Sequence, residues 1–372
     1  MSLVAPVGIS FYSIQMITYL ADLYSQKVKA ERNLVRYALF TSFFPTLCSG
    51  PIERAKHFLP QTKSFHIFQY RQVKNGLLLM MWGFFQKLVI SDRIAIFVNE
   101  IYGQWHQVLG YLLMIATFLY AFQIYCDFSG YSDIAIGAAQ VLGFQVTNNF
   151  HQPYFSRSVA EFWRRWHISL SSWFRDYIYI PLGGNRHGKW VQYRNILIVF
   201  IISGLWHGAS WNFIVWGGIH GIFQIVENFS MPMRNKLKEI AKIKTDCFSY
   251  HFFQTALTFF AVDFAWIFFR APGAKTALHI IKKMLSPEFS SFHIEELFHA
   301  GLNKENFCVL FVSLILLLIV DLFRHNQNIR QFIEQQNLPF RWLIYYCGIF
   351  SIIIFGIYGP GYDASTFVYM QF

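Results

Sequence analysis

The feature that most constrains this sequence is a run of 32 residues, 195–226, without Asp, Glu, Lys or Arg. One α-helix of that length would extend about 48 Å, whereas the hydrocarbon core of a membrane is about 30 Å thick. We therefore expect the run to tilt strongly, to break, or to form two segments. Gly204 and Gly208, and likewise Gly217 and Gly221, have the G-x-x-x-G spacing that favours close helix packing.

Other apolar stretches recur along the chain, at 1–21, 37–52, 76–98, 101–126, 134–150, 247–269, 306–323 and 342–362. Backbone polar groups in lipid must bond within their own segment, and no alternating strand pattern is visible, so these stretches are helices. Pro45, Gly50 and Pro51 interrupt one of them, which is typical of a re-entrant segment. The sequence predicts an all-α polytopic membrane protein of roughly eight to ten membrane helices, forming one membrane-embedded domain over residues 1–372.

Composition and charge exclude several classes of protein. Charged residues make up 14% of the chain, against about 25% in soluble domains, which argues against a polar cytosolic enzyme. The net charge is +11, but the basic residues alternate with apolar stretches and form no soluble basic domain, so we expect no nucleic-acid binding. They suit an anionic membrane surface, and the basic connection 230–246 is predicted to be cytoplasmic. The five widely spaced cysteines predict neither disulfides nor a zinc site.

Residues 157–177 combine tryptophan with arginine. The large apolar side chains recur at steps of three and four residues, so on one helix they share a face: Trp163, Trp166, Leu170, Trp173 and Tyr177. A second face carries Arg164, His167, Ser171 and Arg175. This pattern predicts one helix lying in the membrane interface, ended by Pro181 and Gly183.

Two interpretations of the basic residues in 157–194 remain open. Seven basic and two acidic residues give this block a net charge of +5. The arginines could hold an anionic ligand, such as a phosphate-bearing acyl donor. Alternatively, they anchor the block on an anionic leaflet, and charge alone favours this second interpretation.

Two histidines stand in apolar surroundings. His207 lies near the middle of the uncharged run, and an ionisable residue inside a membrane indicates a functional site. Histidine suits general acid–base chemistry, although a packed histidine bonded to a carbonyl is an equal alternative. His167 is the second candidate, for which a structural role is the commoner explanation. His220 is nearer the end of the run, and we expect it to be structural.

Two carboxylates follow the stretch 101–126. Asp127 and Asp133 are six residues apart, which places them on different helical faces unless the chain turns at Gly130. They could line the mouth of a reaction chamber. We favour a role in helix capping instead.

Several motifs resemble those of the membrane-bound O-acyltransferases, in particular the branch of the bacterial alginate O-acetyltransferase membrane subunit. The motifs are Trp163-Arg-Arg-Trp-His-Ile-Ser-Leu-Ser-Ser-Trp-Phe-Arg-Asp176, Gly183-Gly-Asn-Arg186, Ser203-Gly-Leu-Trp-His-Gly-Ala209, Pro6-Val-Gly-Ile-Ser-Phe-Tyr12, Phe44-Pro45, Gly50-Pro-Ile52, Tyr125-Cys-Asp-Phe-Ser-Gly-Tyr-Ser-Asp133, Phe264-Ala-Trp-Ile-Phe-Phe-Arg270 and Phe367-Val-Tyr-Met-Gln-Phe372. The resemblance runs nearly from end to end.

This resemblance implies acyl transfer across a bacterial inner membrane, in a central chamber surrounded by re-entrant and interfacial helices. His207 matches the catalytic histidine, acting as general base or taking the acetyl group transiently, and His167 matches the second position. The expected donor is acetyl-CoA, with no bound cofactor or metal. An SGNH-type periplasmic partner is expected to complete transfer to an extracytoplasmic polysaccharide. We expect six residues to contact the substrates, the arginines on the donor's phosphates: Arg164, Arg165, Arg175, Asp176, Trp206 and Asn212.

The resemblance also raises an expectation about the N-terminus. Members of the family usually have several helices before the Pro-Val-Gly-Ile-Ser-Phe-Tyr motif, which begins here at residue 6. The domain is therefore expected to lack the usual N-terminal helices.

Three alternatives to acetylation of a polysaccharide such as alginate remain open. Peptidoglycan is the second acceptor. D-alanyl transfer to teichoic acid is disfavoured by the Gly-Gly-Asn-Arg turn and the terminal motif. A solute transporter could also use broken helices and deep histidines, although transport does not require the Trp/Arg/His block at 157–187.

Overall fold

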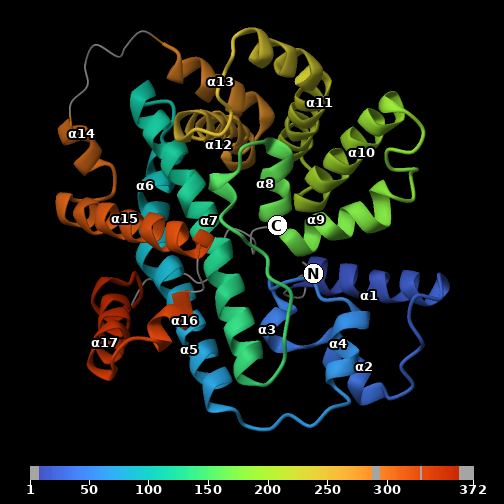
Figure 1. Cartoon of the computed structure of the whole chain (residues 1–372). Helices are drawn as coiled ribbons and strands as arrows, with labels where there is room; N and C mark the ends of the chain where they lie inside the picture. The colour runs from blue at the N-terminus through green and yellow to red at the C-terminus, as the bar shows by residue number, and fades with distance from the viewer. Residues whose placement is uncertain (1–7, 287–293, 327–328, 360–372) are drawn as a thin grey trace, which may run out of the picture. The chain divides into compact units, whose positions relative to one another are not determined.

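The computed structural model describes residues 8–286, 294–326 and 329–359, and these residues form helices and connections without a β-strand (Figure 1). The motif 367–372 and the first two residues of the motif 6–12 lie outside this description. The helices are α1 (Ile9–Tyr24), α2 (Leu34–Thr41), α3 (Phe44–Leu47), α4 (Ala55–Gln61), α5 (Tyr70–Phe84), η1 (Phe85–Ser91), α6 (Asp92–Gly103), α7 (Gly110–Val141), η2 (Pro153–Phe155), α8 (Val159–Arg165), α9 (Ile168–Phe174), η3 (Arg175–Tyr179), α10 (Lys189–His207), α11 (Trp211–Ile240), α12 (Phe248–Arg270), α13 (Ala274–Met284), α14 (Ile294–His299), α15 (Lys304–Asn326), α16 (Ile329–Glu334) and α17 (Leu338–Phe355).

Four helices in the described part of the chain are long and apolar enough to cross a membrane: Gly110–Val141, Phe248–Arg270, Lys304–Arg324 and Leu338–Phe355. The all-α class is therefore confirmed. The number of such helices is smaller than the eight to ten that the apolar stretches predicted. One reason is that α1 has only 16 residues. The interruption predicted in 37–52 is present, because α2 ends at Thr41 and α3 has four residues.

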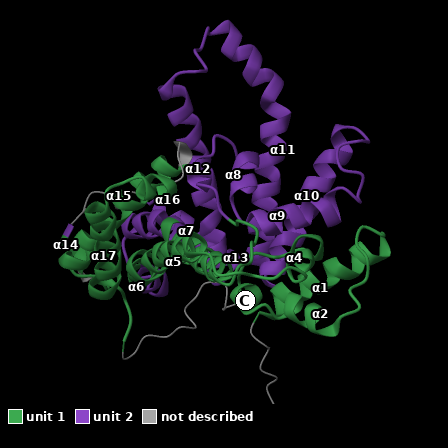
Figure 2. Ribbon diagram, turned by 60° about the horizontal axis from the view of Figure 1, so that its bottom comes forward, with its two compact units in different colours: residues 1–97, 122–149, 295–372 green, residues 98–121, 150–294 purple. Residues whose placement is uncertain are grey.

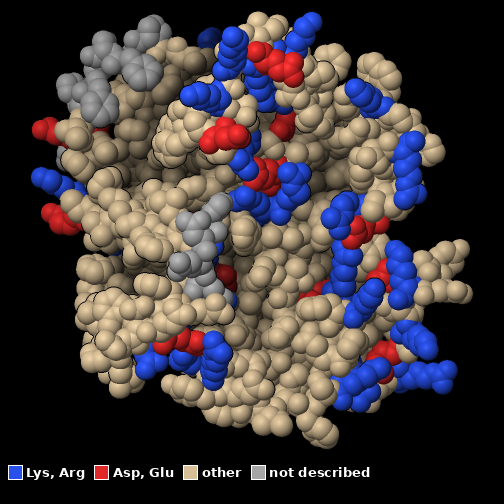
Figure 3. Space-filling model, in the orientation of Figure 1, with Lys and Arg blue, Asp and Glu red and all other residues tan. Residues whose placement is uncertain are grey.

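The chain divides into two compact units (Figure 2). Unit 1 comprises residues 1–97, 122–149 and 295–372, and unit 2 comprises 98–121 and 150–294. On the face shown in Figure 3, charged side chains form groups separated by broad areas of uncharged side chains, as a membrane protein requires.

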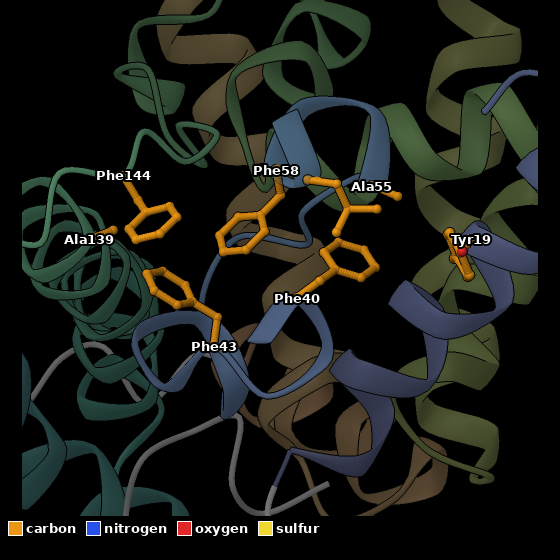
Figure 4. Close-up of a cluster of buried hydrophobic side chains, with 8 residues drawn as sticks. Tyr19, Phe40, Phe43, Ala55, Phe58, Ala139 and Phe144 are labelled. Atoms are coloured by element: carbon orange, nitrogen blue, oxygen red, sulfur yellow. The ribbon is translucent and has the colours of Figure 1, made fainter. Parts of the chain in front are cut away.

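Unit 1 has an aromatic core that joins its N-terminal helices to the end of α7 (Figure 4). Phe58 stacks on Phe144 with ring centroids 5.2 Å apart, and Phe43 lies 4.9 Å from Phe58. Phe40 packs on the other side of Phe58, at 5.9 Å. These contacts connect segments far apart in the sequence, so the hydrophobic effect holds α2, α4 and the residues after α7 together.

A network of ionic and polar side chains lies elsewhere in unit 1. Lys87 Nζ is 2.7 Å from an oxygen of Asp127 and 2.8 Å from one of Asp92. Asp133 accepts a hydrogen bond from the Gln86 amide and lies 3.6 Å from the Arg324 guanidinium. Asp127 and Asp133 both lie inside α7, which continues through Gly130. The expected capping role is therefore wrong, and these carboxylates are paired with cations instead.

Unit 2 contains the hairpin of α10 and α11. The long uncharged run breaks as predicted: α10 ends at His207, and α11 begins at Trp211. Close packing at the glycines is also confirmed. A Cβ on Gly204 would lie 2.2 Å from the Phe213 carbonyl oxygen, and one on Gly217 would lie 2.1 Å from that of Phe200. The two backbones therefore approach too closely for a side chain at either position.

The helix α11 is longer than the uncharged run suggested. It continues to Ile240, so most of the predicted connection 230–246 is helical. The remaining turn, at 241–247, leads into α12, and the two helices extend as a hairpin from the rest of unit 2 (Figure 2). The cytoplasmic placement of this basic segment stays a prediction.

Replacing Gly217 by alanine will destabilise the hairpin by about 1–3 kcal/mol, because the new methyl group meets backbone atoms that no rotamer change can move. Gly218→Ala is the matched control, since a Cβ there has no neighbour within 4 Å. Thermal unfolding of both variants in detergent will show a lowered Tm for Gly217→Ala alone. Equal midpoints would mean that the helices can separate without cost.

Candidate functional site

His207 is the last residue of α10 and is 3% exposed. Aromatic rings surround its imidazole. The ring centroids of Trp216 and Phe269 lie 5.1 and 5.2 Å away, both nearly perpendicular to it, and that of Trp206 lies 4.8 Å away. The break after His207 thus places the histidine where α10, α11 and α12 meet, in surroundings that exclude water.

His167 lies at a break that the sequence did not predict. The region 157–177 forms α8, α9 and η3 instead of one helix, and His167 occupies the left-handed conformation between α8 and α9 (φ 45°, ψ 55°). Non-glycine residues adopt this conformation uncommonly, and backbone strain of this kind clusters at functional sites. The break also buries both Trp166 and His167, each 1% exposed, so the prediction of separate Trp and His faces on one helix is wrong.

Trp206 brings the two histidines into one site. Its ring centroid is 4.8 Å from that of His207 and 6.2 Å from that of His167. The structure therefore brings together three residues that the sequence singled out, two of them titratable side chains in a dry environment.

A third buried histidine, His220, lies on α11 and is 0% exposed. Its Nδ1 accepts a hydrogen bond of 3.2 Å from the indole N–H of Trp163 on α8. Its ring is perpendicular to that of Trp216, which also contacts His207. We expected a structural role, but its position beside this site makes His220 a functional candidate. The i, i+4 spacing of Trp216 and His220 is the sequence signal that could have indicated it.

The arginines of the predicted anion site are largely engaged with carboxylates. Arg165 lies 2.6 Å from Glu161, and Arg175 lies 2.8 Å from Asp176. This hydrogen bond to Asp176 raises the pKa of Arg175. Arg164 is exposed, and the described residues offer it no ion-pair partner. The two ion pairs reduce the charge available to an anionic ligand, and the expected phosphate contacts stay a prediction.

Asn212 joins two helices of the site. Its side-chain amide donates to the Ala271 carbonyl at 3.2 Å and to that of Phe268 at 3.4 Å, which fastens the start of α11 to the end of α12. The predicted contact of Asn212 with substrate stays a prediction, whereas its role in positioning α11 against α12 is visible.

The described residues contain no group of three His, Cys, Asp or Glu side chains that could hold a metal ion.

Apolar helices of membrane length and a cluster of buried histidines define an all-α membrane protein with a buried polar site. The chain belongs to the membrane-bound O-acyltransferase family, whose model matches residues 3–269. This range includes His167, Trp206, His207 and His220.

The chain is similar to relatives that have three different protein names. The chain is 37% identical over 325 residues, 87% of its length, to the probable alginate O-acetylase AlgI of Pseudomonas syringae. It is 35% identical over 82% of its length to a peptidoglycan O-acetyltransferase of Helicobacter pylori. It is 30% identical over 64% of its length to a teichoic acid D-alanyltransferase of Bacillus subtilis. The chain spans between 60% and 62% of the length of these relatives.

Proposed function

We propose that this chain is a membrane-embedded O-acetyltransferase that passes an acetyl group from cytoplasmic acetyl-CoA to an extracytoplasmic polysaccharide such as alginate. The observation that carries the proposal is the site itself: His167 and His207 are both buried beside Trp206, in a chain that belongs to a family of O-acyltransferases. The relatives named as alginate O-acetylases support the choice of acceptor.

His207 is the catalytic base in this proposal. It takes the proton from an acceptor hydroxyl while that oxygen attacks the thioester carbonyl. A new C–O bond forms, the C–S bond breaks, and the proton passes from His207 to the departing thiolate. His167, which also lies beside Trp206, orients the thioester. Because a thiolate leaves readily, orientation plus one base is sufficient chemistry.

The same proposal includes acetyl-CoA as the acyl donor and a periplasmic partner protein. The exposed Arg164 is the first candidate to attract the phosphates of acetyl-CoA, while Arg175 can do so only by exchanging Asp176 for the ligand. The multi-pass chain lies in the bacterial inner membrane, and an SGNH-type periplasmic protein accepts the acetyl group on the outer side.

Peptidoglycan is the second candidate acceptor. The Helicobacter pylori relative named for that reaction is 35% identical, close to the 37% of the alginate relative. The relative named for D-alanyl transfer covers less of the chain.

Gene deletion and complementation will test this function. Loss of the gene is expected to remove base-labile acetate from the extracytoplasmic polysaccharide, and the wild-type gene to restore it. Acetate on peptidoglycan and D-alanine on teichoic acid are measured in the same cells. Loss confined to peptidoglycan acetate would move the proposal to the second acceptor. Loss of D-alanine esters, or solute flux in proteoliposomes without acyl-CoA turnover, would contradict it.

A further inference from the structure

Three buried side chains with N–H groups lie together next to His207. Trp216 and His220 lie on α11, and Trp266 lies on α12; their exposures are 1%, 0% and 0%. The ring centroids are 5.2 Å apart for Trp216 and His220, 5.8 Å for Trp216 and Trp266, and 6.3 Å for His220 and Trp266. The three rings therefore form one compact cluster, called here the donor cluster.

The hydrogen bond from Trp163 determines where His220 carries its proton. Since the Trp163 indole is always a donor, His220 Nδ1 accepts and the neutral ring is protonated at Nε2. The donor cluster thus presents three N–H groups: Nε2–H of His220, Nε1–H of Trp216 and Nε1–H of Trp266. Among the described residues, none of these nitrogen atoms has a hydrogen-bond partner.

Leaving such groups without a partner is unfavourable. A buried donor without an acceptor costs about 1–3 kcal/mol, and native proteins satisfy the large majority of such groups. Stacking between the two indoles of the cluster does not replace an acceptor. The indoles of Trp216 and Trp266 are stacked at 21°, so their in-plane N–H bonds do not point at each other's faces. Three unsatisfied donors in one cluster indicate an oxygen-bearing group that the described residues do not supply.

We propose that the donor cluster binds the carbonyl oxygen of the acyl group and stabilises the negative charge that this oxygen gains during transfer. The inference rests on the proposed function, because Trp216 places the cluster beside His207, at 5.1 Å between ring centroids. As the hydroxyl oxygen attacks the carbonyl carbon, the C=O electron pair moves onto the oxygen held by the N–H groups. The pair returns when the C–S bond breaks. Fixed donors in a dry site favour that charged state most.

Each member of the cluster has a substitution that removes only its donor. Trp216→Phe and Trp266→Phe keep an aromatic ring but lose the N–H. His220→Asn retains an acceptor near the Nδ1 position but loses the Nε2 donor, whereas His220→Gln places an amide donor near Nε2. Removing a single oxyanion donor lowers kcat by about 10²-fold in other enzymes. We expect a fall in kcat of at least about tenfold for the two Phe variants and His220→Asn, with little change in KM and partial rescue in His220→Gln. Trp190→Phe is the control, since Trp190 is 83% exposed.

A binding measurement that does not depend on turnover completes the test. The full chain in lipid nanodiscs, labelled with ¹⁵N-tryptophan, is titrated with S-acetonyl-CoA, a ketone analogue without the reactive thioester, and separately with CoA. Indole N–H resonances are assigned from the Phe variants. Those of Trp216 and Trp266 are expected to shift downfield with the ketone and not with CoA, while that of Trp190 stays in place.

The outcomes separate this inference from the proposed function. If neither cluster resonance moves, the donors serve ordered water or the fold, and the inference is wrong even if the wild-type chain transfers acetyl. If both move but no acyl donor is turned over, the oxygen site stands and the proposed function fails. Unchanged kcat in both Phe variants would also overturn the inference.

Discussion

Replacing His207 by glutamine will abolish polymer acetylation while the protein still inserts into the membrane. Glutamine has a similar volume and can fill the space between Trp206, Trp216 and Phe269, but it cannot accept the hydroxyl proton. General base catalysis contributes about 10²–10⁴-fold, so we expect a rate loss in that range. Acetyl transfer from radiolabelled acetyl-CoA, normalised to the amount of membrane-inserted chain, measures it.

A matched substitution distinguishes a chemical effect from a structural one. His187 is an exposed histidine in the same unit, and His187→Gln is expected to retain full activity. His207→Gln and wild type should also have similar Tm values, because the surrounding aromatic rings remain. Acetylation at wild-type rates in His207→Gln would remove His207 from the catalytic role and leave His167 as the candidate base.

The long uncharged run shows what the sequence could predict about the site. Length alone predicted that 195–226 would tilt strongly, break or form two segments, and the structure shows the break. Glycine spacing predicted close helix packing, which the structure places between α10 and α11. Both follow from local geometry: the thickness of a membrane limits a helix, and a missing side chain permits close approach. The depth of His207 was predicted from its place near the middle of the uncharged run, and the side chain is 3% exposed.

The region 157–177 shows what periodicity cannot reveal. Its tryptophans recur at helical spacing on both sides of His167. The pattern therefore does not reveal that this one residue adopts the left-handed conformation. That one residue turns Trp166 towards Trp266, at 5.2 Å between ring centroids. Burial of Trp166 thus involves packing against α12, which is remote in the sequence.

The capping role predicted for the acidic residues of α7 was wrong for a related reason. Capping is a local interaction, whereas Asp127 pairs with Lys87, 40 residues earlier in the chain. Asp133 pairs with Arg324 on α15. A pattern of two carboxylates cannot identify partners on other helices. The same limit applies to the donor cluster, where Trp266 of α12 meets two residues of α11.

Replacing Lys87 by methionine will strongly destabilise unit 1. Its ammonium group is the shared partner of Asp92 and Asp127, at 2.8 and 2.7 Å, and all three side chains are largely buried. Methionine retains most of the apolar stem but leaves two carboxylates without this cation. Removing one partner from a buried ion pair costs about 3–5 kcal/mol, because the remaining charge lacks both water and a counter-ion. We therefore expect a large fall in Tm in detergent and a reduced yield of folded protein.

Removing one carboxylate together with the lysine tests this physical reason. In the double variant Lys87→Met, Asp127→Asn, one of the two buried carboxylate charges is absent, so part of the lost stability should return. Lys56→Met is the control, since Lys56 is exposed on α4 of the same unit and its loss should change stability by no more than about 0.5 kcal/mol. If Lys87→Met and Lys56→Met unfold at the same temperature, the carboxylates must already be neutral. The ion pairs of Lys87 would then add nothing to the free energy of unfolding.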